Sequence, residues 1–136
     1  MAQSVNLTSA KKVGTKGRAD TSLGRAGEFY AAYKLQMAGG GLNVSHIDNT
    51  CDLHVTLPSN RVLRVEVKTA GVISQYGSYR FNRGGSDADI FVLVAIRIGL
   101  LRIVSASEIN KSTITLRPED FTQQAEDDDI AGLFLH

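Results

Sequence analysis

The stretch RVEVKTA, residues 64–70, decides how this chain can fold. Its apolar residues Val65 and Val67 alternate with the charged residues Glu66 and Lys68. Alternation with a period of two is typical of a β-strand that buries one face. The strand therefore carries a carboxylate and an amine two positions apart on its other face, and the rest of the sequence indicates what they do there.

A second alternating run, Cys51–Leu57, precedes this strand across the short loop 58–60, whose sequence is Pro-Ser-Asn. Two such runs around a Pro/Asn loop predict an antiparallel β-hairpin. In the register that matches their apolar residues, Asp52 lies directly opposite Glu66, with Cβ atoms about 5 Å apart. Lys68 lies two residues further along the same face. The hairpin thus predicts that two acidic groups and one ammonium group converge on one spot.

Two carboxylates at that distance repel each other, and left alone one of them would bind a proton. A hard divalent cation removes this conflict, because Mg²⁺ favours carboxylate oxygens and water as ligands. The ammonium group can orient or deprotonate a metal-bound water and can stabilise an anionic transition state. The combination predicts phosphodiester hydrolysis. The alternative is an ordinary ion pair on a half-exposed strand, which would contribute little to stability.

The remaining segments predict an α/β fold of the mixed α+β kind, with a central mixed β-sheet flanked by helices. One helix is expected from a cap at Thr21 or Ser22 to the glycines at 39–41. Its apolar residues at helical spacing are Leu23, Ala26, Tyr30, Tyr33 and Met37. The opposite side carries Ala31, Ala32 and Leu35 beside Glu28 and is apolar enough to be covered by the sheet, which would bring Glu28 near the hairpin. Further strands are expected at Leu42–Asp48, Tyr79–Asn82, Ile90–Ile98, Leu100–Val104 and Ser112–Leu116, with one helical turn at Ser105–Asn110.

The length of 136 residues and the hydrophobic fraction of 43% suit one domain with one core. We expect a flexible basic arm over residues 1–20 and a folded domain over residues 21–136. The longest apolar run, Ile90–Ile96, is far too short to span a bilayer, so no membrane partner is expected. The single cysteine, Cys51, and the lack of an apolar leader favour a reducing cytoplasm.

Basic residues gather in the N-terminal segment, where they can form an electrostatic footprint for nucleic acid. The expected DNA contacts are Lys11, Lys12, Lys16, Arg18, Arg25, Arg80 and Arg83. Such contacts set affinity rather than sequence preference. The alternative for the N-terminal cluster is a solvated tail.

With these features together, the sequence resembles the PD-(D/E)XK nuclease superfamily. The resemblance is to its small members, the archaeal-type Holliday junction resolvases and the group I intron or phage endonucleases. Their pattern is a helix bearing Glu, then Asp at a strand start, then Glu-x-Lys in the next strand. Here it reads LGRAGEFYAAYKLQMAGG with Glu28, NTCDLHV with Asp52, and LRVEVKTA with Glu66 and Lys68. The proline that gives the superfamily its name is absent.

The resemblance implies a nuclease-like domain with a restriction endonuclease-like core of element order αβββαβ. It implies that Asp52, Glu66 and the carbonyl oxygen of Val67 bind Mg²⁺, for which Mn²⁺ can substitute. Lys68 would position the attacking water or stabilise the transition state. Glu28 would bind a second metal ion or a metal-bound water. The expected substrate is duplex or branched DNA, including Holliday junctions. The expected enzyme is a homodimer or higher homo-oligomer in the cytoplasm of a prokaryotic or phage-infected host cell.

Alternatives remain at this point. A non-catalytic nucleic-acid-binding or interaction module could retain the nuclease fold, and an RNA-directed nuclease would use the same groups. A zinc site built from His46, Asp48, Cys51 and His54 fits no standard structural spacing. The apolar C-terminal run IAGLFLH, residues 130–136, could serve an oligomer interface or the core.

Overall fold

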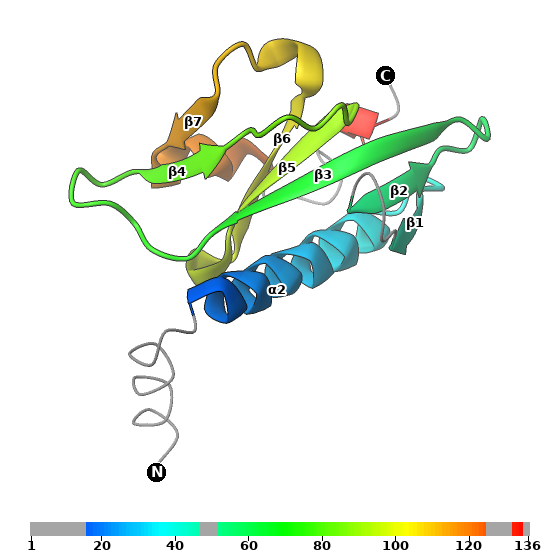
Figure 1. Cartoon of the computed structure of the whole chain (residues 1–136). Helices are drawn as coiled ribbons and strands as arrows, with labels where there is room; N and C mark the ends of the chain where they lie inside the picture. Colours follow the sequence, from blue (N-terminus) through cyan, green and yellow to red (C-terminus); the bar gives the residue numbers. More distant parts are fainter. Residues whose placement is uncertain (1–15, 47–51, 125–131, 135–136) are drawn as a thin grey trace.

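The computed structural model describes residues 16–46, 52–124 and 132–134. Its elements, with η marking short 3₁₀ helices, are α2 (Lys16–Met37), β1 (Asn43–His46), β2 (Leu53–Thr56), β3 (Val62–Ala70), β4 (Tyr79–Asn82), β5 (Ile90–Ala95), η1 (Ile96–Ile98), β6 (Leu100–Ser105), η2 (Ala106–Glu108), β7 (Thr113–Leu116) and η3 (Pro118–Gln124). Figure 1 shows α2 along one face of the main strands, with β4 and β7 on the other side. The predicted mixed α+β class is confirmed.

The main sheet has five strands in the order β1-β2-β3-β5-β6. β3 and β5 run parallel, and the other neighbouring pairs run antiparallel, so the predicted mixed sheet is also confirmed. The connection between β3 and β5, residues 71–89, is described in full and contains β4 but no helix. The second helix of the expected αβββαβ order is therefore not in this connection. β4 instead pairs with β7 in a separate two-stranded sheet.

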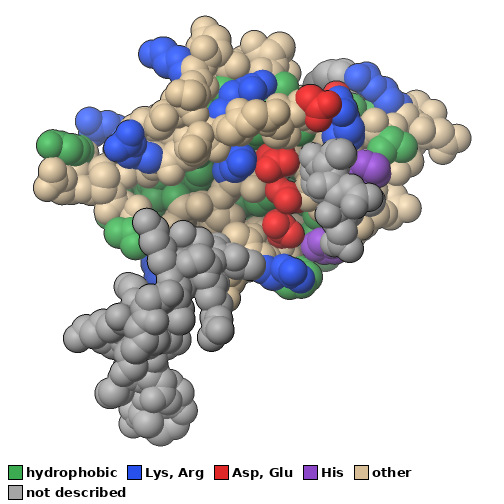
Figure 2. All heavy atoms as spheres, in the orientation of Figure 1, with side chains coloured by type: hydrophobic (Ala, Val, Ile, Leu, Met, Phe, Trp, Pro, Cys, Tyr) green, Lys and Arg blue, Asp and Glu red, His purple; other side chains and the backbone are tan. Residues whose placement is uncertain are grey.

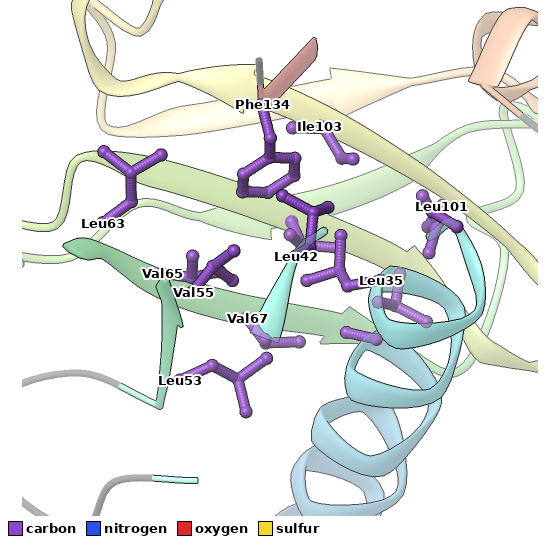
Figure 3. Packing of buried hydrophobic residues seen from close by; sticks show 14 residues of the cluster. Leu35, Leu42, Leu53, Val55, Leu63, Val65, Val67, Leu101, Ile103 and Phe134 are labelled. Atoms are coloured by element: carbon purple, nitrogen blue, oxygen red, sulfur yellow. The ribbon is translucent and has the colours of Figure 1, made fainter. Parts of the chain in front are cut away.

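Strand β5 is buried along nearly its whole length because other elements cover both of its faces. Val92 and Val94 belong to the cluster closed by α2, while Phe91 and Leu93 belong to the cluster under β4, β7 and η3. Figure 3 shows the first cluster, where Phe134 packs among side chains of the sheet. Because Phe134 is only 3% exposed, this part of the C-terminal run serves the core.

Helix α2 packs on the sheet mainly through small side chains. Ala31 and Leu35 are fully buried, whereas Tyr33 and Met37 are 60% and 58% exposed. Ala26 is exposed as well. The side of the helix with Ala31, Ala32 and Leu35 is therefore the one that the sheet covers, as expected, whereas Ala26, Tyr33 and Met37 lie on the exposed side. Small residues let the helix backbone lie close to the strands, and the large side chains point to the opposite side.

Helix α2 begins at Lys16, so the expected start at Thr21 or Ser22 is wrong. The sequence just before Thr21 contains no proline that would stop a helix. Residues 16–20 are thus helical. Residues 1–15 lie outside the described part of the chain, and the flexible arm remains a prediction there.

The ends of the later strands follow from local turns. The predicted strand Ile90–Ile98 stops at Ala95, because residues 96–98 form η1 and Gly99 takes φ 65°, which reverses the chain into β6. The predicted helical turn after Ser105 is η2, and Ser105 and Glu108 form a reciprocal capping box at its start. Within the described residues, no helix is long and apolar enough to cross a membrane.

Candidate active site

The β2–β3 hairpin has the register expected from the sequence. Leu53 pairs with Val65, and the N–H of Leu57 donates to the carbonyl of Arg61 at 2.8 Å across the turn. Asn60 adopts a left-handed conformation with φ 70° at this turn, which asparagine tolerates better than most residues. Asp52 directly precedes β2, and its N–H donates to the carbonyl of Val65 at 3.1 Å, so the predicted register brings it next to the Glu66 segment of β3.

Within the described residues, no strand pairs with β3 at Val67 on the side of β2, because β2 begins only at Leu53; we call this stretch the open edge of β3. Asp52 takes the place of a neighbouring strand there: its Oδ2 accepts a hydrogen bond from the backbone N–H of Val67 at 2.7 Å. The N–H and C=O groups of one strand residue point to the same side. The carbonyl oxygen of Val67 therefore faces the same open edge as the Asp52 carboxylate.

Glu66 and Lys68 lie on the sheet face that α2 does not cover. The Lys68 Nζ is 3.4 Å from the Glu66 Oε2, and the Ser86 hydroxyl donates to the Glu66 Oε1 at 3.3 Å. The two side chains are 16% exposed for Glu66 and 27% exposed for Lys68. A Cβ on Gly84 would come within 3.5 Å of the Lys68 Nζ, so the loop after β4 passes directly beside the ammonium group. The Glu66–Lys68 pair thus lies between Ser86, which hydrogen-bonds Glu66, and the backbone at Gly84, which lies beside Lys68.

Ser86 was not among the residues singled out from the sequence. It lies in an irregular loop 20 residues after Glu66, where neither periodicity nor a motif marks it. Its hydroxyl also accepts from the N–H of Ala88 at 3.1 Å, which fixes its position. Only the parallel pairing of β3 with β5 brings this loop back to the site.

Glu28 reaches the same edge from helix α2. Burial raises the pKa of Glu28, the charge of Asp52 raises it further, and Arg25 partly opposes these effects. A hydrogen bond with Asp52 and the charge of Glu66 add to the upward shift. Figure 2 shows the resulting line of acidic side chains in the middle of this face, with a cationic side chain beside it. The Glu28 carboxylate thus lies near those of Asp52 and Glu66, and burial together with their charges disfavours its ionisation.

The donor set at this edge consists of oxygen atoms, which suits a hard cation such as Mg²⁺. Within residues 16–46, 52–124 and 132–134, no three His, Cys, Asp or Glu side chains are already arranged as metal ligands. The residues nevertheless fit such an ion, because a bound cation would offset the burial and the repulsion by Asp52 that raise the pKa of Glu28. The carboxylates of Asp52, Glu66 and Glu28 and the carbonyl of Val67 are the groups available to hold it.

The cations expected to contact DNA differ in their placement. Arg25 is exposed on α2 close to Glu28, and Arg80 is exposed on β4. Arg83 is partly buried, with its guanidinium carbon 5.2 Å from the centre of the Phe91 ring, so this contact occupies one face of the guanidinium group. Lys16 and Arg18 lie in α2, but the positions of their side chains are not described, and Lys11 and Lys12 lie outside the described residues.

Arg64 lies on the same face as Glu66 but is already paired. Its guanidinium group is 3.1 Å from the Asp87 Oδ2 and 3.5 Å from the Asp89 Oδ1. Burial by itself would raise the pKa of Asp89. The hydrogen bonds from the backbone N–H and the guanidinium group of Arg64, the charge of Arg64 and the charge of Arg61 outweigh burial, so the pKa of Asp89 lies below its usual value. This network joins β3 to the segment before β5 and neutralises a cation next to the site.

The rival zinc constellation is only partly described. His46 packs edge-to-face against Phe29, with ring centroids 5.2 Å apart. Asp48 and Cys51 lie outside the described residues. The described members therefore give no support for a zinc centre.

The three-dimensional arrangement matches that of a solved nuclease. No protein-family model matches the sequence, and no curated protein does. The structure is similar to that of the bacterial homing endonuclease I-Ssp6803I, with a TM-score of 0.59 over 83% of this chain and 87% of that chain, at 21% identity. The chain has an endonuclease fold. At 21% identity the two chains share the endonuclease fold. Any catalytic activity of this chain depends on its own residues at the open edge of β3.

Proposed function

We propose that this chain is a Mg²⁺-dependent endodeoxyribonuclease that hydrolyses phosphodiester bonds. The observation that carries the proposal is the meeting of the Glu28, Asp52 and Glu66 carboxylates with the Lys68 ammonium group at one open sheet edge. The endonuclease fold makes such a site plausible at this place, because the same fold is used by a homing endonuclease.

The side chains of the proposed site have different roles in hydrolysis, set by their charges. Asp52, Glu66 and the Val67 carbonyl would hold Mg²⁺, with Glu28 as an additional ligand; when bound, the ion supplies Lewis-acid activation of the phosphate and of a water molecule. Lys68 offers a positive charge where negative charge develops on the phosphate oxygens, and it can orient the attacking water. The Val67 N–H fixes Asp52, and Ser86 fixes Glu66, so both acids are held in place before substrate binds.

The substrate of this proposal is DNA, duplex or branched. Arg25 and Arg80 are the exposed cations best placed to contact its backbone, with the basic residues 11, 12, 16 and 18 as further candidates. Cutting both strands of a duplex or a junction calls for two active sites, so we propose that the enzyme works as a homodimer or a higher symmetric oligomer.

The test is cleavage of supercoiled plasmid, linear duplex, a four-way junction and matching RNA, each with Mg²⁺, Mn²⁺ or EDTA. Asp52→Asn is the sharpest variant, because the remaining amide oxygen can still accept from the Val67 N–H while one ligand charge is lost. We expect Asp52→Asn and Lys68→Ala each to slow DNA cleavage by about 100-fold or more. Asp87→Asn is the matched control, because Asp87 pairs with Arg64 rather than with the proposed site.

Cleavage by both variants at the wild-type rate, with their folding intact, would overturn the proposal. DNA binding by the wild type without cleavage of any substrate in either metal would favour the non-catalytic module. Preferential cleavage of RNA would assign the same site to an RNA-directed nuclease.

A further inference from the structure

The β4–β7 sheet has an outward face that no other described element covers. Its paired residues Arg80 and Thr115, and Asn82 and Thr113, are all exposed. The alternate residues point inward: Tyr79, Phe81 and Leu116 are buried against the sheet and Phe121. The two strands thus form a ribbon that is anchored by one face and presents four polar side chains on the other.

This ribbon leads directly into the proposed active site. The chain leaves β4 through Arg83 and Gly84, and the N–H of Gly84 donates to the Asn82 Oδ1 at 3.1 Å. Gly84 in turn lies beside the Lys68 Nζ. Figure 2 shows cationic side chains over the β4–β7 side of the face that carries the line of carboxylates. A nucleic acid held at the carboxylates would therefore extend over the ribbon.

The side-chain types on the outward face suit base edges better than phosphates. A phosphate-binding surface needs several cations, but this face carries one, Arg80, together with Asn and two Thr. Within the described residues, no carboxylate pairs with Arg80. Arg makes a bidentate contact with guanine, while Asn and Thr can hydrogen-bond to bases, and the Thr methyl can contact that of thymine. Because the Asn82 Oδ1 is already used, its amide offers mainly donors.

The dimensions also fit duplex DNA. The major groove admits a two-stranded β-ribbon. Residues two apart on one strand are separated by about 6.7 Å, which corresponds to about two steps of 3.4 Å along one DNA strand. Arg80 and Asn82 can therefore face bases two steps apart.

We infer that the outward face of the β4–β7 ribbon reads base edges in the major groove of the DNA, with Arg80 as its main specificity-determining residue. The inference rests on the proposed function for the position of the DNA, but it concerns sequence preference rather than cleavage. It changes the role of Arg80 from a backbone contact to a base contact.

The test is selection of bound duplexes from a random pool by the full-length protein, with Ca²⁺ in place of Mg²⁺ so that binding is read without cleavage. We expect the wild type to enrich a preferred sequence that contains a guanine. Arg80→Lys keeps the charge but lacks the planar fork that recognises guanine, and Arg80→Ala lacks both. Both variants should lose about tenfold or more of the discrimination at that guanine. Arg61→Ala is the control, because Arg61 lies at the hairpin turn, far from β4 (Figure 1).

The same selection separates the competing explanations. Enrichment of the same sequence by the wild type and both Arg80 variants would overturn the inference, as would binding by the wild type with no enrichment. If Arg80→Lys behaves as wild type and Arg80→Ala weakens all sequences equally, Arg80 is a phosphate contact and the inference is wrong. None of these outcomes depends on whether Asp52→Asn abolishes cleavage, so failure of the proposed nuclease activity is read separately.

Discussion

Glu28 is a residue whose charge the fold disfavours. Burial raises its pKa, and the charges of Asp52 and Glu66 reinforce the shift. A carboxyl group whose pKa is raised in the folded state binds its proton more tightly there than in the unfolded chain. Its contribution to stability is therefore present at low pH and is lost as the pH rises through the pKa of the folded state.

This linkage predicts opposite effects of Glu28→Gln with and without metal. In EDTA at pH 8, the variant should have a melting temperature higher than the wild type by on the order of a few degrees, because a repelling charge is gone. At pH 4 the difference should shrink, because wild-type Glu28 is then protonated. Added Mg²⁺ should raise the melting temperature of the wild type more than that of the variant.

Thermal unfolding followed by circular dichroism measures these shifts. Asp87→Asn provides the contrast, because it removes an attractive partner of Arg64 and should not stabilise the protein in EDTA. A Glu28→Gln variant with lower stability than the wild type in EDTA at pH 8 would contradict the explanation.

At the scale of elements, the close approach of α2 to β3 positions Glu28. A Cβ added to Gly27 would come within 2.8 Å of the Thr69 Cβ, which is closer than real side chains pack. Gly24, three residues earlier on the same helix, has nothing within 4 Å of such a Cβ. The helix can therefore rest on β3 only at the position where the side chain is missing.

Substitution of these two glycines by alanine should have opposite effects. Gly27→Ala should destabilise the protein by about 1–3 kcal/mol, because the helix must move away from β3. Gly24→Ala should stabilise it by about 0.5–1 kcal/mol, because alanine is the better helix former. Chemical denaturation measures both changes, and Thr69→Ala should partly restore stability to Gly27→Ala. Equal effects of the two substitutions would argue against this account of the packing.

The sequence predicts the hairpin register well, the buried face of α2 less clearly, and the Ser86 contact poorly. The alternation around residues 58–60 determines the hairpin register, because a one-residue slip would turn every apolar side chain outward. The buried face of α2 consists largely of Gly and Ala, whose hydrophobic signal is weak, so the sequence marks this face less clearly than it marks the strands. Ser86 joins the site only through the crossover from β3 to β5, a long-range contact that no local pattern encodes.

At the scale of the whole molecule, the C-terminal segment closes the core. Phe134 is 3% exposed, whereas its neighbour Leu133 is 43% exposed. Phe134→Ala should therefore lower the free energy of unfolding by about 3–5 kcal/mol. Leu133→Ala should change it by less than about 1 kcal/mol. Urea denaturation distinguishes the two, and a similar small loss for both would mean that the segment does not contribute to the core in solution.

The exposed side of α2 offers a place for the proposed second copy. Phe29, Tyr33 and Met37 lie four residues apart, and each is more than half exposed. Such a stripe of large apolar side chains is typical of a helix that meets a partner. We expect Tyr33→Glu to shift the assembly toward monomer in light scattering, while Ile98→Glu, which also charges an exposed apolar residue, should not. A wild-type monomer at micromolar concentration would rule out this assembly.

The late start of β2 at Leu53 has a consequence beyond the chemistry of hydrolysis. A strand edge with free amide and carbonyl groups is a template onto which an extended segment of another molecule can add, and this is a route to aggregation. By occupying the Val67 amide with a charged oxygen, Asp52 makes this stretch of β3 a poorer template for such an addition. Loss of the Asp52 carboxylate would therefore both weaken binding of the proposed ion and make this edge of β3 more prone to aggregation.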